Sequence, residues 1–116
     1  MTNPPLTKTR LGDLAHARSG DKGDRANIGV VAHNALAYEQ LRIHLDADSV
    51  LGYFKSLGVA SVRRYELPNL RAFNFVLEHA LGGGASRSLR LDTQGKALGV
   101  ALLELNLQID TPSSLS

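Results

Sequence analysis

The apolar residues of this chain fall into short segments with two different periodicities, and this pattern most constrains how the chain can fold. Some segments alternate apolar and polar residues or are rich in β-branched residues, as is typical of strands. These segments are 11–17, 28–32, 59–67, 88–91 and 105–109. In other segments apolar residues recur with a period of about 3.6, which favours amphipathic helices. These segments are 35–45, the residues after Asp46, and 70–80. The two kinds are interleaved without regular βαβ spacing, which predicts an antiparallel or mixed sheet with helices on one face.

Local residues set the expected ends of the helices. Asp46 can cap the second helix, and Gly58 lies just past its end. Glycines 82–84 are expected to end the third helix, because consecutive glycines in a helix lose too much conformational entropy. Residues 96–103 are open to two interpretations: a helix capped by Asp92, which we favour, or part of a hairpin that turns at 92–95.

A chain of 116 residues is long enough for one hydrophobic core and too short for two. The sequence therefore predicts a flexible leader at 1–10, a single domain at 11–110 and a frayed tail at 111–116. The expected fold class is α+β, as a ferredoxin-like two-layer sandwich with a mostly antiparallel sheet.

The composition excludes several function classes. The chain has no cysteine, so it has no disulfide, no thiolate zinc site and no cysteine nucleophile. Its net charge is only +2, its cations are scattered among acids and aromatics make up 5%, which argues against nucleic acid binding. No apolar run is long enough for a membrane span and no signal peptide is evident, so we expect a cytoplasmic protein. His33, His44 and His79 lack partners at metal-ligand spacing, and we expect neither metal nor cofactor.

The polar segment from His16 to Asn27 concentrates most of the candidate chemistry. Ser19 to Asp24 contains two glycines and two aspartates, which predicts a loop between two strands. The segment has three cations and two acids, a balance that suits anion capture by backbone N–H groups and cations better than a divalent metal. The competing interpretation is a structural turn closed by surface ion pairs. The predicted ligand-binding residues of this loop are Arg18, Ser19, Gly20, Lys22, Gly23, Asp24 and Asn27.

A second candidate segment comprises the third expected helix and the residues around it. Asn74 and Glu78 are four residues apart, so they share one face of that helix. Asn69, Arg71 and Arg87 flank its ends and are predicted to bind a ligand in the same cleft. The competing interpretation is that Asn69 only caps the helix and that Arg71 is solvated.

Three stretches of the chain, at 17–29, 65–75 and 80–84, resemble a known family. This is the AtuA-like family, which comprises the C-terminal ferredoxin-like domain of acyclic terpene utilisation proteins and its stand-alone relatives. The resemblance extends from about Leu11 to Ile109. It implies a ferredoxin-like fold and a role in the acyl-CoA catabolism of branched or terpenoid acids. We expect this protein to lack the large N-terminal domain of the full-length relatives. The resemblance therefore implies a homo-oligomer or a separately encoded large AtuA-like subunit as partner.

Three functional hypotheses follow. The leading one is an accessory or ligand-binding subunit of acyl-CoA metabolism, whose Arg18 to Asn27 loop grips an anionic group such as a CoA phosphate or a carboxylate. The alternative is an acyl-CoA lyase or hydratase with its active site at a subunit interface, where His16 or Asp21 acts as general base and Asn74 stabilises an enolate. The third is a structural oligomerisation module.

Overall fold

The computed structural model describes residues 6–22, 25–78 and 97–110. The helices and strands in these ranges follow in the order β1 (Leu6–Arg10), β2 (Ala15–Lys22), β3 (Arg25–Ala32), α1 (Ala35–His44), α2 (Ala47–Phe54), β4 (Ser61–Leu67), β5 (Ala72–Glu78), α4 (Ala97–Leu102) and β6 (Asn106–Asp110). Short 3₁₀ turns occur at Leu11–Asp13, Lys55–Leu57 and Pro68–Leu70.

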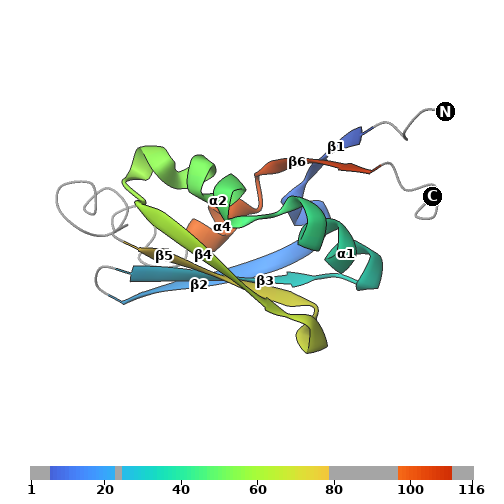
Figure 1. The fold of residues 1–116 in the computed structure, drawn as a ribbon, viewed down its shortest axis with the longest axis horizontal. Coiled ribbons are helices and arrows are strands. Elements are labelled where there is room, and N and C mark those ends of the chain that lie inside the picture. The colour runs from blue at the N-terminus through green and yellow to red at the C-terminus, as the bar shows by residue number, and fades with distance from the viewer. Residues whose placement is uncertain (1–5, 23–24, 79–96, 111–116) are drawn as a thin grey trace.

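The main sheet has the strand order β2-β3-β5-β4, and every neighbouring pair in it is antiparallel. Strands β3 and β4 both run antiparallel to β5, so they are parallel to each other, and the chain crosses between them through α1 and α2. This is a split βαβ unit. Helices α1, α2 and α4 all lie on one face of the sheet (Figure 1). The expected α+β sandwich with helices on one face is therefore confirmed.

The hydrophobic core lies between the sheet and these helices. Ile28 and Val30 of β3 and Phe73 and Phe75 of β5 are completely buried. Tyr38 of α1 stacks on Phe73 with 4.9 Å between the ring centroids. Because side chains alternate along a strand, the residues between these core positions point to the opposite face of the sheet. No helix in the described part of the chain covers that face.

Strands β1 and β6 form a separate antiparallel ribbon, in which Leu6 pairs with Asp110 and Arg10 with Asn106. Residues 6–10 were expected to belong to a flexible leader, and the structure shows them as a strand instead. The pairing partner of β1 lies at the opposite end of the sequence, so no local pattern indicates it. The alternation of residues 105–109 correctly predicts β6, whose Leu107 and Ile109 are buried.

Helices with local end signals form where the sequence predicts them. Helix α1 matches the expected helix at 35–45, and the carboxylate of Asp46 caps α2 by accepting the Ser49 N–H at 2.8 Å. Gly58 follows in the left-handed conformation, with φ of 95°. Helix α4 confirms the favoured interpretation of residues 96–103, and β4 confirms the expected strand at 59–67. The expected strand at 88–91, the glycine stop at 82–84 and the Asp92 cap lie outside the described residues.

The expected helix at 70–80 is wrong, because residues 72–78 form β5 in the middle of the sheet. Phe73, Phe75 and Leu77 alternate toward the helices, as a strand requires. Ala72 is also buried and Val76 is half-buried on the other face. A central strand with apolar side chains on both faces imitates the spacing of a helix, and pairing with two neighbouring strands decides the outcome.

The expected loop at 19–24 is also wrong over most of its length. Strand β2 starts at Ala15, after a 3₁₀ turn that replaces the first half of the expected strand at 11–17. It continues to Lys22, which pairs with Arg25 of β3. The polar segment is thus a β-hairpin, because the chain can pair its backbone groups across the two strands even where side chains are polar.

Helix α4 packs directly behind β2. The Gly99 N–H donates to the Ser19 hydroxyl oxygen at 2.8 Å, which satisfies one of the free N–H groups in the first turn of the helix. A Cβ atom at position 99 would lie 3.2 Å from the carbonyl carbon of Arg18 and 3.2 Å from Ser19 Oγ. Glycine is therefore needed here for close approach.

Replacing Gly99 by alanine is expected to destabilise the domain by about 1 kcal/mol, because an overpacking cost of about 1–3 kcal/mol exceeds the gain of about 1 kcal/mol in helix propensity. Urea denaturation measures this change. Gly52→Ala in α2 is the matched control, since a Cβ there meets no atom within 4 Å. That variant is expected to gain about 0.5–1 kcal/mol, and equal effects of the two substitutions would contradict the packing of α4 against β2.

Candidate functional site

The sheet face opposite the helices is organised in cross-strand rows. In each row, residues from the four strands lie side by side, about 4.8 Å apart, and successive rows are about 7 Å apart. The first row is His16, Val31, Ala72 and Leu67. The second row is Arg18, Gly29, Asn74 and Tyr65, and the third is Gly20, Asn27, Val76 and Arg63.

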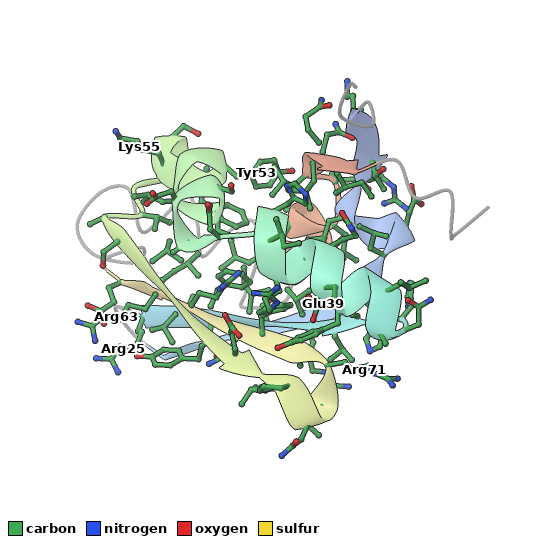
Figure 2. The ribbon with its side chains drawn as sticks, turned by 45° about the vertical axis from the view of Figure 1, so that its right-hand side comes forward. Arg25, Glu39, Tyr53, Lys55, Arg63 and Arg71 are labelled. Carbon is green, nitrogen blue, oxygen red and sulfur yellow. The ribbon has the colours of Figure 1, made fainter. Side chains whose placement is uncertain are left out.

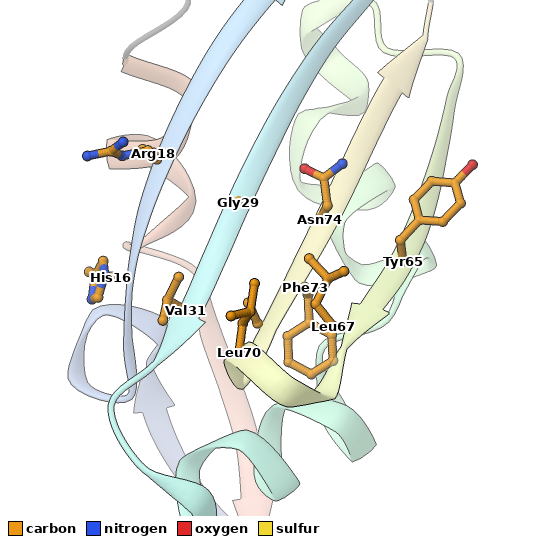
Figure 3. Close-up of a pocket in the computed structure, with 10 residues that line it drawn as sticks. His16, Arg18, Gly29, Val31, Tyr65, Leu67, Leu70, Phe73 and Asn74 are labelled. Carbon is orange, nitrogen blue, oxygen red and sulfur yellow. The ribbon is translucent and has the colours of Figure 1, made fainter.

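The first two rows line a cavity of about 670 Å³. His16 and Arg18 lie at one side of it and Tyr65 at the other, with Gly29 and Asn74 between them (Figure 3). The apolar part of the wall comes from Val31, Leu67, Leu70, Ala72 and Phe73. The cavity is therefore amphipathic, with polar groups in the second row and at His16, and apolar groups in the rest of the first row and in the adjoining turn.

Gly29 forms the floor of the cavity in the middle of the second row. A Cβ atom at this position would lie 3.9 Å from the Arg18 carbonyl oxygen, which is an ordinary contact. Its φ is not in the left-handed region, so the backbone conformation does not require glycine. Glycine inside a strand often marks a place where a ligand or another backbone approaches closely. Here its missing side chain leaves the space between Arg18 and Asn74 open.

The side-chain amide of Asn74 is held by Asn27 from the third row. Asn27 Nδ2 donates to Asn74 Oδ1 at 3.2 Å. The Nδ2 group of Asn74 is therefore left to donate to another acceptor. In Figure 3 this nitrogen lies on the side of Tyr65.

The arginines of this face differ in their surroundings. Arg25 lies 4.0 Å from Glu78. The hydroxyl oxygen of Tyr65 stabilises the charged form of Arg63 and raises the pKa of this guanidinium, with a smaller contribution from Glu78. Figure 2 shows Arg25 and Arg63 at the same end of the molecule, whereas Arg71 lies at the other. No carboxylate among the described residues forms an ion pair with Arg18, so its guanidinium is the cation available to a molecule in the cavity.

The structure brings several predicted site residues together. His16, Arg18 and Asn74 line the same cavity, and Asn27 is hydrogen-bonded to Asn74. The His16 ring centroid lies 6.0 Å from that of His33, which is exposed as expected. This grouping joins residues from both candidate segments of the sequence.

Other predicted residues lie away from the cavity. Ser19 faces the helices, where its hydroxyl accepts the Gly99 N–H. Gly20 lies one row beyond the cavity. Asn69 and Arg71 are exposed beside Leu70, in and after the 3₁₀ turn, and do not line the cavity.

The structure places the predicted anion-binding residue Gly20 in a strand, where a loop was expected. Gly20 belongs to β2 and pairs with Asn27. Consecutive N–H groups of an extended strand point to opposite edges, so they do not converge on one anion as they do in a turn. The backbones of Asp21 and Lys22 pair with Ala26 and Arg25. Their side chains, like the whole of the predicted residues Gly23, Asp24 and Arg87, lie outside the described part of the structure.

Four further residues line the cavity that were not predicted as site residues from the sequence: Gly29, Tyr65, Leu67 and Leu70. The alternation of Tyr65 and Leu67 with the charged residues Arg64 and Glu66 was the available signal. Both side chains are exposed, at 47% and 40%, and Leu70 is exposed at 66%. Large exposed apolar side chains that lie together indicate a binding surface.

Two further features of the described residues bear on function. They contain no group of three or more metal-ligating side chains close enough to hold an ion. None of their helices has the length and apolar character to cross a membrane.

The fold and the site together define an α+β sandwich with helices on one face of its sheet and an amphipathic cavity on the other. The chain belongs to the AtuA ferredoxin-like domain family, whose family model matches residues 9–108. This match confirms the family resemblance and the ferredoxin-like fold predicted from the sequence. Comparisons with curated proteins and with solved structures gave no match.

Proposed function

We propose that this domain is an accessory, ligand-binding subunit of acyl-CoA catabolism, and that it binds an anionic acyl ligand in the open-face cavity. One observation carries the proposal: the cavity combines the available cation Arg18 and the amide of Asn74 with an apolar wall. The resemblance to the AtuA-like family supports branched or terpenoid acids as the class of ligand.

The two parts of the cavity suit the two parts of such a ligand. An acyl chain packed against Val31, Leu67 and Leu70 is stabilised by about 0.8 kcal/mol for each buried CH₂ group. The guanidinium of Arg18 presents several N–H donors in a planar fork, which matches the oxygens of a carboxylate or phosphate. The domain thus recognises both the chain and the charge of its ligand.

Arg18→Gln is expected to weaken ligand binding about tenfold, because a hydrogen bond to a charged group contributes about 1.5–3 kcal/mol. Octanoate and octanoyl-CoA, titrated into ¹⁵N-labelled protein, serve as probes, and chemical shifts of Gly29 and Asn74 report occupancy of the cavity. Arg25→Gln is the control, since it removes the same charge from the same face outside the cavity. If neither probe shifts these resonances, or if both variants weaken binding equally, the proposal fails.

A second candidate function is an acyl-CoA lyase or hydratase. It is favoured by one observation, that His16 lines the cavity together with Asn74. An imidazole can act as general base near neutral pH, and an amide N–H can stabilise an enolate oxygen. Turnover of an acyl-CoA by the isolated chain, abolished in His16→Gln with the fold intact, would favour this candidate over simple binding.

The proposal includes a partner surface that covers the cavity. Small-molecule sites bury about 70–90% of their ligand, whereas no described element lies over this face of the sheet. A second copy of the chain or a separately encoded large subunit would complete the enclosure.

Leu70→Asp is expected to disrupt that assembly with little loss of monomer stability, because Leu70 is 66% exposed. Sedimentation velocity and a pull-down with tagged protein test both partners, and an unchanged assembly in both contradicts this part of the proposal.

A further inference from the structure

We infer that two copies of this chain pair through their β4 strands, antiparallel, with Tyr65 of one copy directly opposite Tyr65 of the other. The inference concerns the edge of the sheet and is independent of the proposed ligand. Strand β4 pairs with β5 on one side, and no described strand lies on its other side. The unpaired backbone groups of an edge strand are a template for pairing with another chain.

The side chains of β4 are exposed toward its end, where another strand can reach them. Arg63, Tyr65 and Leu67 are exposed on the open face of the sheet, and Glu66 is exposed on the helix face. In Figure 3 the Tyr65 ring extends outward from β4, away from β5. The described part of this strand therefore offers apolar and charged side chains to a second strand along its free edge.

The other edge of the sheet, β2, is less suited to pairing with a copy of itself. Its described side chains on the open face include His16 and Arg18 and no acid that could oppose them. On its other face, helix α4 packs against Ser19. The charge pattern therefore favours β4 as the edge that a second copy uses.

The geometry of an antiparallel pair leaves few registers. Residues directly opposite each other point to the same face of the sheet, so a two-fold axis must pass between a residue and its own copy. Within Ser61–Leu67, only axes at residues 63, 64 and 65 pair five or more residues of each strand. Each of these registers puts different side chains opposite each other.

Charge selects among the three registers. An axis at residue 63 or 64 sets Arg63 or Arg64 against itself, and like charges directly opposite each other are destabilising. An axis at residue 65 sets Tyr65 against itself and places Arg64 of each copy opposite Glu66 of the other. Within each copy, the Arg64 guanidinium already donates to the Glu66 carboxylate at 2.7 Å. The third register therefore forms a network of four charges of alternating sign.

This register joins the two sheets with their open faces on the same side, because opposite residues share a face. The second cross-strand row then runs from one copy into the other, with the two tyrosines at its centre. Pairing stops after Leu67, since Pro68 has no N–H group to donate. The cavities of both copies therefore open in the same direction.

Single cysteines test the register, because the chain has no cysteine of its own. In Tyr65→Cys the Cα atoms of the two cysteines lie about 4.5–5.5 Å apart, a distance that a disulfide spans. Arg63→Cys is the matched control on the same face. Each of its cysteines lies opposite Leu67 of the other copy, so the two Cα atoms are about 14 Å apart and cannot be bridged. In a glutathione redox buffer we expect a disulfide-linked dimer of Tyr65→Cys only.

Glu66→Lys tests the charge pairs without introducing a cysteine. It places a lysine opposite Arg64 at both symmetric positions and is expected to weaken the dimer at least about tenfold. Glu104→Lys is the matched control, since it makes the same change in charge and also breaks a surface ion pair, with Arg10 at 3.1 Å, between α4 and β6. Sedimentation velocity from micromolar to millimolar concentration measures the dissociation constants, and urea denaturation verifies that each variant is folded.

A crosslink confined to Tyr65→Cys, together with weakening confined to Glu66→Lys, supports the inference. A chain that stays monomeric at millimolar concentration overturns it and leaves the edge to a strand of another protein. Equal crosslinking of the two cysteine variants, or equal weakening by the two lysine variants, also overturns it. None of these outcomes bears on ligand binding. Leu70 lies beyond the paired residues 63–67, so Leu70→Asp and Glu66→Lys distinguish the assembly that covers the cavity from this dimer.

Discussion

Replacing Gly29 by valine (Gly29→Val) should weaken ligand binding about ten- to hundredfold while the fold remains intact. The valine side chain would occupy the floor of the cavity between Arg18 and Asn74, and inserting methyl groups into occupied space costs about 1–3 kcal/mol, or about ten- to hundredfold in affinity. The backbone tolerates the change, since the new Cβ atom lies 3.9 Å from its nearest neighbour. Titration with octanoate, followed by urea denaturation of the same samples, measures both effects.

Gly20→Val provides the matched control for this prediction. Gly20 lies on the same face in the adjoining row, outside the cavity, and a Cβ atom there would lie 3.7 Å from Asn27 Oδ1. Both variants replace a strand glycine by a β-branched residue, so both are expected to keep or slightly raise stability. Only Gly29→Val should weaken octanoate binding. Normal binding by Gly29→Val would show that no ligand crosses the second row.

Phe73→Ala is expected to lower the free energy of unfolding by about 3–5 kcal/mol, the usual cost of truncating a buried phenylalanine. Phe73 is completely buried, stacks on Tyr38 and carries the Arg64 guanidinium 5.1 Å above its ring. Arg64 in turn donates to the carbonyl oxygens of Arg42 and Leu45 at the end of α1. Because small domains are stable by only about 5–15 kcal/mol, this loss is a large part of the total. Chemical denaturation followed by circular dichroism measures it.

Val76→Ala tests the strand assignment in the same element. Val76 lies on the open face of β5 and is only partly buried, so its truncation should cost much less than that of Phe73. A strand places residues 73 and 76 on opposite faces, whereas a helix places residues three apart on the same face. Similar losses from the two substitutions would contradict the β5 assignment.

The helices could be predicted because their ends are marked by nearby residues. Asp46 caps α2 through the Ser49 N–H, and Gly58, expected just past the helix end, follows it in the left-handed conformation. Such signals depend on residues a few positions apart, so one sequence is enough to find them. The β1–β6 ribbon and the interior position of β5 depend on partners far along the chain, and the sequence pattern did not indicate them.

Only some residues of the candidate site could be predicted, because the others are brought to the cavity by strand pairing between distant parts of the chain. His16, Arg18 and Asn74 carry functional groups, so they could be identified one by one. Asn74 and Glu78 were expected on one face of a helix. In the structure they share one face of the sheet, because side chains alternate along β5 and these two positions differ by four, an even number. Tyr65 joins the site only through the register of β4 against β5, which pairs it with Asn74. Register across a sheet is set by the whole fold.

The ribbon of β1 and β6 makes completion of the domain depend on β6, a strand far along the chain from its partner β1. The N–H of Leu11 donates to the Leu105 carbonyl at 2.8 Å, and that of Gly12 to the Leu103 carbonyl at 2.9 Å. Until residues 103–110 have been synthesised, β1 has no partner strand and these donors have no acceptors. A nascent chain therefore exposes an unpaired strand edge until β6 has been synthesised, and it is open to aggregation during that period.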